Sequence, residues 1–446
     1  MLITGGTLAD GRVRDVRIDG ETIAAVESDL VPADDERVID ARGKHLLPGA
    51  IDVHVHFREP GGSHKETWET GSQSAAAGGV TTVVDQPNTD PPTVDGETFD
   101  AKAALAAADS VVDYGINGGV VDTWDPERLL DRPLFALGEV FLADSTGEMG
   151  IEMDLFEDAL ARATAANVPV TVHAEDASLF DPDALDGDLG GVGRQARSDR
   201  WSAFRTPEAE AAAVERAVAA GEDVDGRIHV AHTSTPEGID ATVGTTATCE
   251  VTPHHLFLST DDCDRLGTFG RMNPPLRDPD RRAAVFERLR DGHVDVVATD
   301  HAPHAAMEKR RTLTDAPSGV PGVETMVPLL LEAVRRDELT LERVRDVTAR
   351  NPASIFGLAR KGAIEPGRDA DLVLVDLEDP REIEAAALHS KCGWTPFEGR
   401  SGVFPETTIV RGRLAYERDP VTGVESFGDP LGENVRVAVP FDSDDG

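Results

Sequence analysis

Between residues 49 and 355, segments typical of buried strands alternate with segments typical of helices, and this alternation constrains the fold more than any other feature. Eight strands alternating with helices predict an α/β protein of the (β/α)8 TIM barrel type. The predicted strands are Ala50–His56, Val80–Asp85, Val111–Asn117, Leu134–Leu142, Pro169–His173, Arg227–Ala231, Thr246–Val251 and Val294–Thr299. The helices predicted between them include His64–Ala77, Ile151–Ala166, Pro207–Ala219, Arg281–Arg290 and Val323–Arg336.

Short strand-like segments with Gly and Asp turns occupy both ends of the chain, outside this alternation. Their alternating residues and turn punctuation predict a small β-sandwich domain that takes strands from both termini. We therefore expect a barrel over residues 49–355, a β domain formed by residues 1–48 and 356–430, and an acidic tail over residues 431–446.

The charge of the chain restricts its partners. It has 83 acidic and 43 basic residues, a formal net charge of −40, and the acids are spread along its length. Nucleic acid is excluded as a partner because phosphate binding needs a basic face. So acidic a surface suits a halophilic protein whose charges are screened by salt. The absence of long apolar runs predicts no membrane partner, and three scattered cysteines with no signal-peptide pattern indicate a cytoplasmic protein.

Two histidines stand near the end of the first predicted barrel strand. His54 and His56 are two residues apart, so their side chains point to the same side of the strand. Two converging imidazoles form half of a metal site. The alternative is that they are two ordinary strand histidines.

Further ligand types recur at the ends of other barrel strands: His173 after the fifth, His232 after the sixth and Asp300 after the eighth. Active-site residues of this fold come from these strand ends, so the set predicts a two-metal hydrolytic site. A bridging ligand is expected from the fourth strand, where Glu139 lies among apolar residues. Asp144 is the alternative bridge, and an ion-paired or surface role is the alternative for Glu139.

The chemistry expected of this set is hydrolysis of a C–N amide bond, or its formation in reverse. A metal-bridging water would be the nucleophile, and Asp300 would carry a proton from it to the leaving nitrogen. Arg58 has the planar fork that suits a carboxylate, and Asn88 and His304 are placed to help it hold an anionic substrate. Histidine and carboxylate ligands suit zinc, and also cobalt or manganese.

These motifs resemble the amidohydrolase superfamily and, within it, the dihydroorotase family. The resemblance covers almost the whole chain and is carried by segments that begin at Asp52, Gln86, His173, His232, Arg271, Thr299 and Lys391. It implies reversible cyclisation of N-carbamoyl-L-aspartate to L-dihydroorotate in pyrimidine synthesis, with two zinc ions per subunit. The implied metal ligands are His54, His56, His173, His232 and Asp300; the implied substrate contacts are Arg58, Asn88, His304, Asn273 and Gly322.

In one respect the sequence departs from the family pattern. Many relatives use a carboxylated lysine as the bridge on the fourth strand, and this strand contains Glu139 and no lysine. We therefore expect a glutamate bridge that needs no modification.

The same motifs also allow two alternative functions: an enzyme with a different substrate, or a protein that catalyses no reaction. Allantoinases and hydantoinases are the nearest alternatives, and Arg58 argues against them because their substrates have no free carboxylate. A non-catalytic scaffold for aspartate carbamoyltransferase is a further alternative, against which stand the intact ligands. A second copy of the chain and aspartate carbamoyltransferase are the protein partners that the resemblance brings into consideration.

Overall fold

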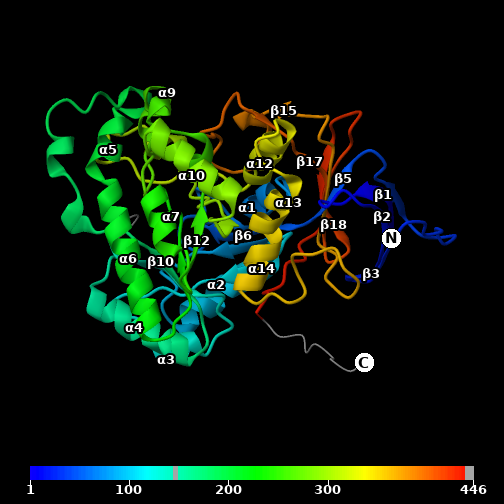
Figure 1. The fold of residues 1–446 in the computed structure, drawn as a ribbon, viewed down its shortest axis with the longest axis horizontal. Helices are drawn as coiled ribbons and strands as arrows, with labels where there is room; N and C mark the ends of the chain where they lie inside the picture. The colour runs from blue at the N-terminus through cyan, green and yellow to red at the C-terminus, as the bar shows by residue number, and fades with distance from the viewer. Residues whose placement is uncertain (144–148, 437–446) are drawn as a thin grey trace.

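The computed structural model describes residues 1–143 and 149–436 of the chain. Figure 1 shows two parts: a larger α/β part in which helices surround a group of strands, and a smaller β part that contains the N-terminal strands and the red C-terminal ones. Within the described residues, no helix has the length and apolar character needed to cross a membrane.

All eight predicted strands of the α/β part are present, as parallel strands in two sheets. One sheet consists of β6 (Ala50–Val55), β7 (Val80–Asp85) and β8 (Asp113–Ile116). The other consists of β9 (Leu137–Phe141), β10 (Val170–His173), β11 (Ile228–Val230), β12 (Thr248–Val251) and β13 (Val296–Val297). Single parallel bridges, Gly118 to Leu137 and Val55 to His301, connect the two sheets. The strands are buried on both faces, as expected for parallel sheets covered by helices.

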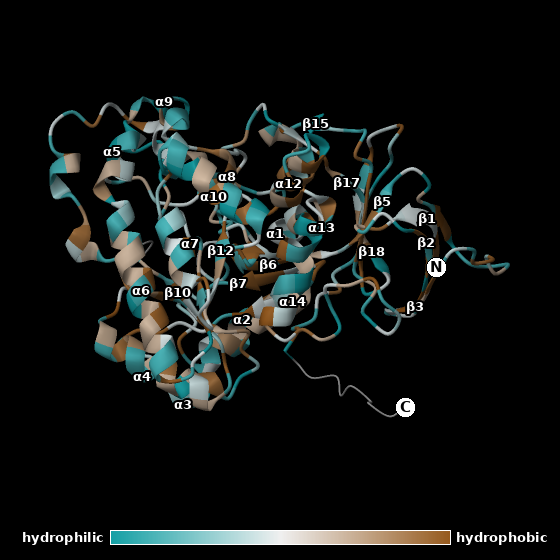
Figure 2. Ribbon diagram, viewed as in Figure 1, coloured by the Kyte–Doolittle hydropathy of each residue, from teal (hydrophilic) through white to brown (hydrophobic). Residues whose placement is uncertain are grey.

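Helices follow the strands as the alternation predicts. The longer ones are α1 (Trp68–Ala77), α2 (Gly96–Asp109), α4 (Met153–Ala165), α6 (Pro207–Asp223), α10 (Pro279–Asp291) and α12 (Met326–Arg335). Helix α1 begins four residues later than expected because the Thr67 side chain accepts a hydrogen bond from the amide of Thr70 and caps the helix there. Figure 2 shows hydrophobic residues on the central strands and hydrophilic residues along the outer helices, consistent with one core between the two layers.

The small β part draws strands from both ends of the chain, which confirms that part of the prediction. From the N-terminal end come β1 (Leu2–Thr7), β2 (Val13–Asp19), β3 (Thr22–Glu27), β4 (Val38–Asp40) and β5 (His45–Pro48). From the C-terminal end come β14 (Leu372–Val375), β17 (Pro405–Val410), β18 (Arg413–Arg418) and β19 (Glu425–Phe427). These strands share one nine-stranded sheet in which β5 pairs with both β1 and β14, so a two-sheet sandwich stays a prediction.

The domain limits also stay predictions. Residues 437–446 of the expected acidic tail lie outside the described residues. Before them, the chain contacts the α/β part: the amide of Leu431 donates to the Ser110 carbonyl, and the amide of Val435 donates to the Tyr114 carbonyl on β8.

Candidate metal centre and substrate pocket

A small pocket lies at the carboxyl ends of the parallel strands, where the sequence places the site. Most of the predicted residues line it: His56, Arg58, Asn88, Glu139, His232, Asn273 and Asp300, with Phe141, Ala302, Ser318 and Gly319 completing the wall. These residues lie within β9, shortly after β6, β7, β11 and β13, or in the loops beyond β12 and β13, so the fold collects them from distant parts of the sequence.

Two overlapping groups of side chains could hold metal ions. His54, His56 and Asp300 form one, and His54, Glu139 and His232 form the other; within each group, the candidate ligand atoms lie within 4.8 Å of one another. The Nε2 atom of His56 is 3.0 Å from Asp300 Oδ1, and the Nε2 atom of His54 is 3.6 Å from the same oxygen. His173 belongs to neither group, but its Nδ1 atom is 3.0 Å from Glu139 Oε1 and 2.9 Å from His232 Nε2.

Glu139 lies between the histidines, as expected of a bridging ligand. Its carboxylate contacts His54, His173 and His232. Burial alone would raise the pKa of this carboxyl, but the neighbouring His232 and His54 hold it well below its usual range. Burial likewise acts against a charge on His173, yet Glu139 and Glu175 raise its pKa to about 9. The carboxylates thus favour positive charge at this centre, which protonated histidines or a bound metal ion would supply. Asp144, the alternative bridge, lies outside the described residues.

The donor set fits a divalent metal. The Nε2 atom of His54 is buried without a hydrogen-bond partner among the described residues, although it faces the carboxylates of Glu139 and Asp300. A buried nitrogen left without a partner is costly unless it binds a ligand. Nitrogen and carboxylate donors together suit zinc, cobalt or manganese.

A second layer of acceptors fixes which nitrogen of His54, His56 and His173 faces the centre. The Nδ1 atom of His54 donates to Glu250 Oε1 at 2.6 Å, and the Nδ1 atom of His56 donates to Asn88 Oδ1 at 2.7 Å. The Nε2 atom of His173 donates to Glu175, which also pairs with the buried Arg205. Such contacts orient metal-ligating imidazoles and leave the other nitrogen free to coordinate.

Glu250 and Glu175 were not assigned a role from the sequence. Both are buried carboxylates, and a charged residue in a buried strand is the signal that could have indicated Glu250. Its two oxygens face His54 and His229, and the amide of His232 also donates to it.

Glu250→Gln is expected to weaken metal binding about 10- to 100-fold because the amide cannot hold His54 in the same way. Competition with a chromophoric chelator would measure the dissociation constant. Glu324→Gln is the matched control, since Glu324 is a buried carboxylate that accepts from Ser74 and His389 instead. An unchanged metal affinity in Glu250→Gln would show that the contact does not orient a ligand.

Arg58 supplies a buried positive charge on the pocket wall. Its Nε atom donates to the Pro303 carbonyl at 3.2 Å, and its Nη2 atom is 3.2 Å from His304 Nε2. It forms no ion pair with a described residue, and burial lowers its pKa. Burial, aided by Arg58 and Lys65, also holds the pKa of His304 well below its usual range, so that ring is neutral. A buried, unpaired guanidinium next to a pocket favours an anionic ligand.

The loops around the pocket are held together by Lys309, the last residue of α11 (Ala306–Lys309). Its buried Nζ atom donates to the carbonyls of Arg271, Pro317 and Gly319 at 2.8–3.0 Å. One of these loops contains Asn273, whose Oδ1 atom accepts a hydrogen bond from the Trp201 indole at 2.9 Å. Lys309 therefore fixes two walls of the pocket relative to each other.

The structure does not bring Gly322 to the pocket. Its amide donates to the Nδ1 atom of His301 at 3.0 Å and so has another partner. Ser318 and Gly319, three or four residues earlier, form that wall instead. The contact of Gly322 with the substrate therefore stays a prediction.

Three of these residues have an unfavourable backbone conformation. Arg58, His232 and Asp300 have φ angles of 65°, 33° and 44°, a region that residues other than glycine rarely adopt. Each costs about 1–3 kcal/mol and persists only where the surrounding structure enforces it, which is typical of functional sites.

The chain as a whole is similar to known proteins. Residues 45–415 match the model of the amidohydrolase family. A dihydroorotase of Halobacterium salinarum is 63% identical over 98% of this chain and 99% of its own length. A dihydroorotase of Methanosarcina acetivorans is 44% identical over 94% of this chain and 92% of its own length.

Solved structures agree with the architecture. An L-hydantoinase (dihydropyrimidinase) from Arthrobacter aurescens superposes with a TM-score of 0.90 at 27% identity, covering 97% of this chain and 98% of that one. A D-hydantoinase (dihydropyrimidinase) from a Thermus species gives a TM-score of 0.86 at 28% identity, covering 98% of both chains.

Proposed function

The chain belongs to the amidohydrolase family, and from this premise we propose that it is a dihydroorotase, which interconverts N-carbamoyl-L-aspartate and L-dihydroorotate with loss or uptake of water. It is a cyclic amide hydrolase. We infer that the reaction serves pyrimidine synthesis. We also infer that the α/β part is a closed eight-stranded barrel, which the two bridges between its sheets support.

The single observation that carries the substrate assignment is Arg58. It is a buried guanidinium on the pocket wall and forms no ion pair with a described residue. The carboxylate that remains outside the dihydroorotate ring is the partner that would satisfy it. Asn88 and His304 would bind the same carboxylate, and Asn273 would contact the ring amide.

The proposed metal ligands are His54, His56, His173, His232 and Asp300, with Glu139 as the bridge, for two zinc ions. Bound there, the ions would lower the pKa of water and polarise the amide carbonyl. Asp300 accepts the proton of the attacking water and donates it to the ring nitrogen as the C–N bond breaks. Its Oδ1 atom lies 3.0 Å from His56 Nε2, so its carboxylate already faces the centre.

The charge of the chain and the protein contacts proposed for it concern where and with what partners it works. Net charge −40 supports a halophilic, cytoplasmic protein whose repulsion is screened by salt. A homodimer and an association with aspartate carbamoyltransferase are the protein contacts that we retain as hypotheses.

A substrate panel distinguishes this assignment from the activity for which the solved hydantoinases are named. Protein in high salt is expected to hydrolyse dihydroorotate, and to show at least about a hundredfold lower kcat/KM with hydantoin or allantoin, because these leave Arg58 unsatisfied. Dialysis against a chelator should abolish turnover, and added zinc should restore it. Preference for hydantoin or allantoin would refute the substrate assignment, whereas metal-independent turnover would refute the metal centre.

A further inference from the structure

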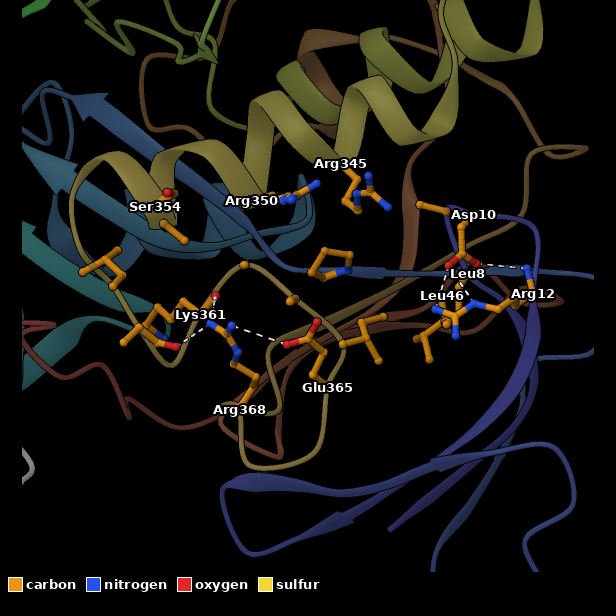
Figure 3. A pocket seen from close by; sticks show the side chains of 18 of the residues that line it. Leu8, Asp10, Arg12, Leu46, Arg345, Arg350, Ser354, Lys361, Glu365 and Arg368 are labelled. Atoms are coloured by element: carbon orange, nitrogen blue, oxygen red, sulfur yellow. Dashed lines mark hydrogen bonds and ion pairs between the residues drawn. The ribbon is translucent and has the colours of Figure 1, made fainter. Parts of the chain in front are cut away.

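A second cavity, of about 650 Å³, shares no lining residue with the pocket of the metal centre. It is formed where the β1–β2 turn meets α13 (Leu341–Arg345), α14 (Asn351–Ile355) and the loop that follows them. Figure 3 shows Arg345 and Arg350 below the helical segment, Asp10 and Arg12 to the right of them, and Lys361 and Arg368 at the lower left. A cavity of this size accommodates a small organic molecule.

The charge of the cavity is opposite to that of the chain. The whole chain has 43 basic and 83 acidic residues. Among the residues that line the cavity, five are basic and two are acidic: Arg12, Arg345, Arg350, Lys361 and Arg368 against Asp10 and Glu365. Lys361 is neutralised by Asp113 and Asp371. The four arginines are therefore the groups that can form ion pairs with a ligand. Arginine is the side chain best suited to phosphate.

The backbone between α13 and α14 brings two of these arginines together. Residues Asp346–Arg350 form one π-helical turn, η6, in which the amide of Asn351 donates to the carbonyl of Asp346, five residues back. In an α-helix, residues five apart would point about 140° away from each other. The wider π turn brings positions 345 and 350 toward the same side, where both line the cavity. Single π turns are rare in proteins overall, and those that occur are often found at functional sites.

The existing partners of the arginines are local and exchangeable. Arg345 contacts its neighbour Asp346, and Arg12 contacts Asp10 two residues away. Arg368 contacts Glu365 three residues away and also donates to the carbonyls of Ala359 and Lys361. Arg350 is the least engaged, with a side chain that is 68% exposed and 3.9 Å from Asp346. The pairs of Arg12, Arg350 and Arg368 reach solvent and contribute little to stability, so a ligand could replace them at small cost.

The floor of the cavity is apolar. Leu8, Leu46, Pro48 and Leu358 line it, and all four are buried. A ligand that satisfies both surfaces has a phosphate for the arginines and an apolar or aromatic body for the floor. We propose that this cavity is a second ligand site, separate from the metal centre, that binds an organic phosphate monoester with an aromatic body.

Calorimetric titration of the full chain tests the site, at the lowest potassium chloride concentration that keeps it folded, because salt screens the arginines. The probes are AMP and phenyl phosphate, with inorganic phosphate and adenosine as the two halves of the ligand. We expect one molecule of AMP or phenyl phosphate per chain, with a Kd at least tenfold lower than that of either half. Failure of both esters to bind more tightly than inorganic phosphate overturns the proposal.

Variants locate the binding. Arg345→Ala/Arg350→Ala should raise the Kd at least tenfold, and the single Arg350→Ala variant, at an exposed position, should raise it in the same direction. The charge-matched control is Arg128→Ala/Arg290→Ala, which removes two arginines that are 80% and 54% exposed elsewhere on the surface. An equal loss in the control would mean that only net charge matters, which refutes the site.

The same experiment must show that the ester binds in this cavity and not at the metal centre. Arg58→Ala protein and chelator-treated protein should both bind AMP with unchanged affinity. Loss of binding in either, with retention in Arg345→Ala/Arg350→Ala, would place the ester in the substrate pocket and overturn the proposal. Neither outcome bears on the proposed dihydroorotase activity, which is measured by turnover.

Discussion

Glu139→Gln is expected to reduce turnover of dihydroorotate at least about a thousandfold, which corresponds to roughly 4 kcal/mol of transition-state stabilisation. The carboxylate contacts His54, His173 and His232, and the neutral amide removes the negative charge that these groups share with the metals. Metal analysis of the purified protein should show fewer ions per chain than in the wild type. Two retained ions with near-normal turnover would refute the bridge.

Glu139→Lys is a sharper form of the same test. A lysine here is expected to be inactive after dialysis under carbon-dioxide-free conditions, and to recover part of its activity in bicarbonate as the amine gains a carboxylate. Glu139→Met is the matched control, because its unbranched side chain has no amine and should not recover. Recovery in the methionine variant would mean that bicarbonate acts elsewhere.

Arg58→Ala is expected to lower kcat/KM for N-carbamoyl-L-aspartate and dihydroorotate about 30- to 5,000-fold, since losing one partner of a buried charge pair costs about 2–5 kcal/mol. Among the described residues, the guanidinium contacts the Pro303 carbonyl and the His304 ring, neither of which is a proposed metal ligand. Metal content should therefore remain at the wild-type level, and steady-state kinetics with metal analysis would check both quantities.

Arg58→Lys separates charge from geometry. It keeps the positive charge and loses the planar fork, so its kcat/KM should lie between those of the wild type and Arg58→Ala. Loss of metal in either variant would show that Arg58 supports the metal centre. An unchanged KM in Arg58→Ala would remove the argument that distinguishes the substrate.

The strand pattern of the α/β part was predictable because buried parallel strands are nearly continuous apolar runs. The β7 limits, Val80–Asp85, match the prediction, and the other strands differ at their ends by a few residues. Helix ends were less predictable, as α1 shows, because a cap depends on one side-chain hydrogen bond. The pairing of β5 with β14 joins residues more than 300 positions apart, which no local pattern contains.

The residues at the strand ends were predictable because their chemical types recur at equivalent positions of one fold. The residues that orient these ligands were not predictable. Glu250 lies 196 residues from His54, and only the folded chain brings their side chains within 2.6 Å. The Gly322 prediction was carried over from a motif, and the motif does not determine which residue of the loop faces the pocket; Ser318 and Gly319 line it, while the amide of Gly322 donates to His301. The assigned roles of the site residues stay predictions until the variants are measured.

The left-handed backbone of Arg58, with its φ of 65°, has a consequence for protein engineering. Glycine at this position would relieve about 1–2 kcal/mol of conformational cost and would also remove an unpaired buried charge. A directed-evolution campaign that selected heat resistance in the absence of substrate would therefore favour glycine at residue 58. Its most thermostable clones would then be poor catalysts, so such a library needs a simultaneous screen for turnover.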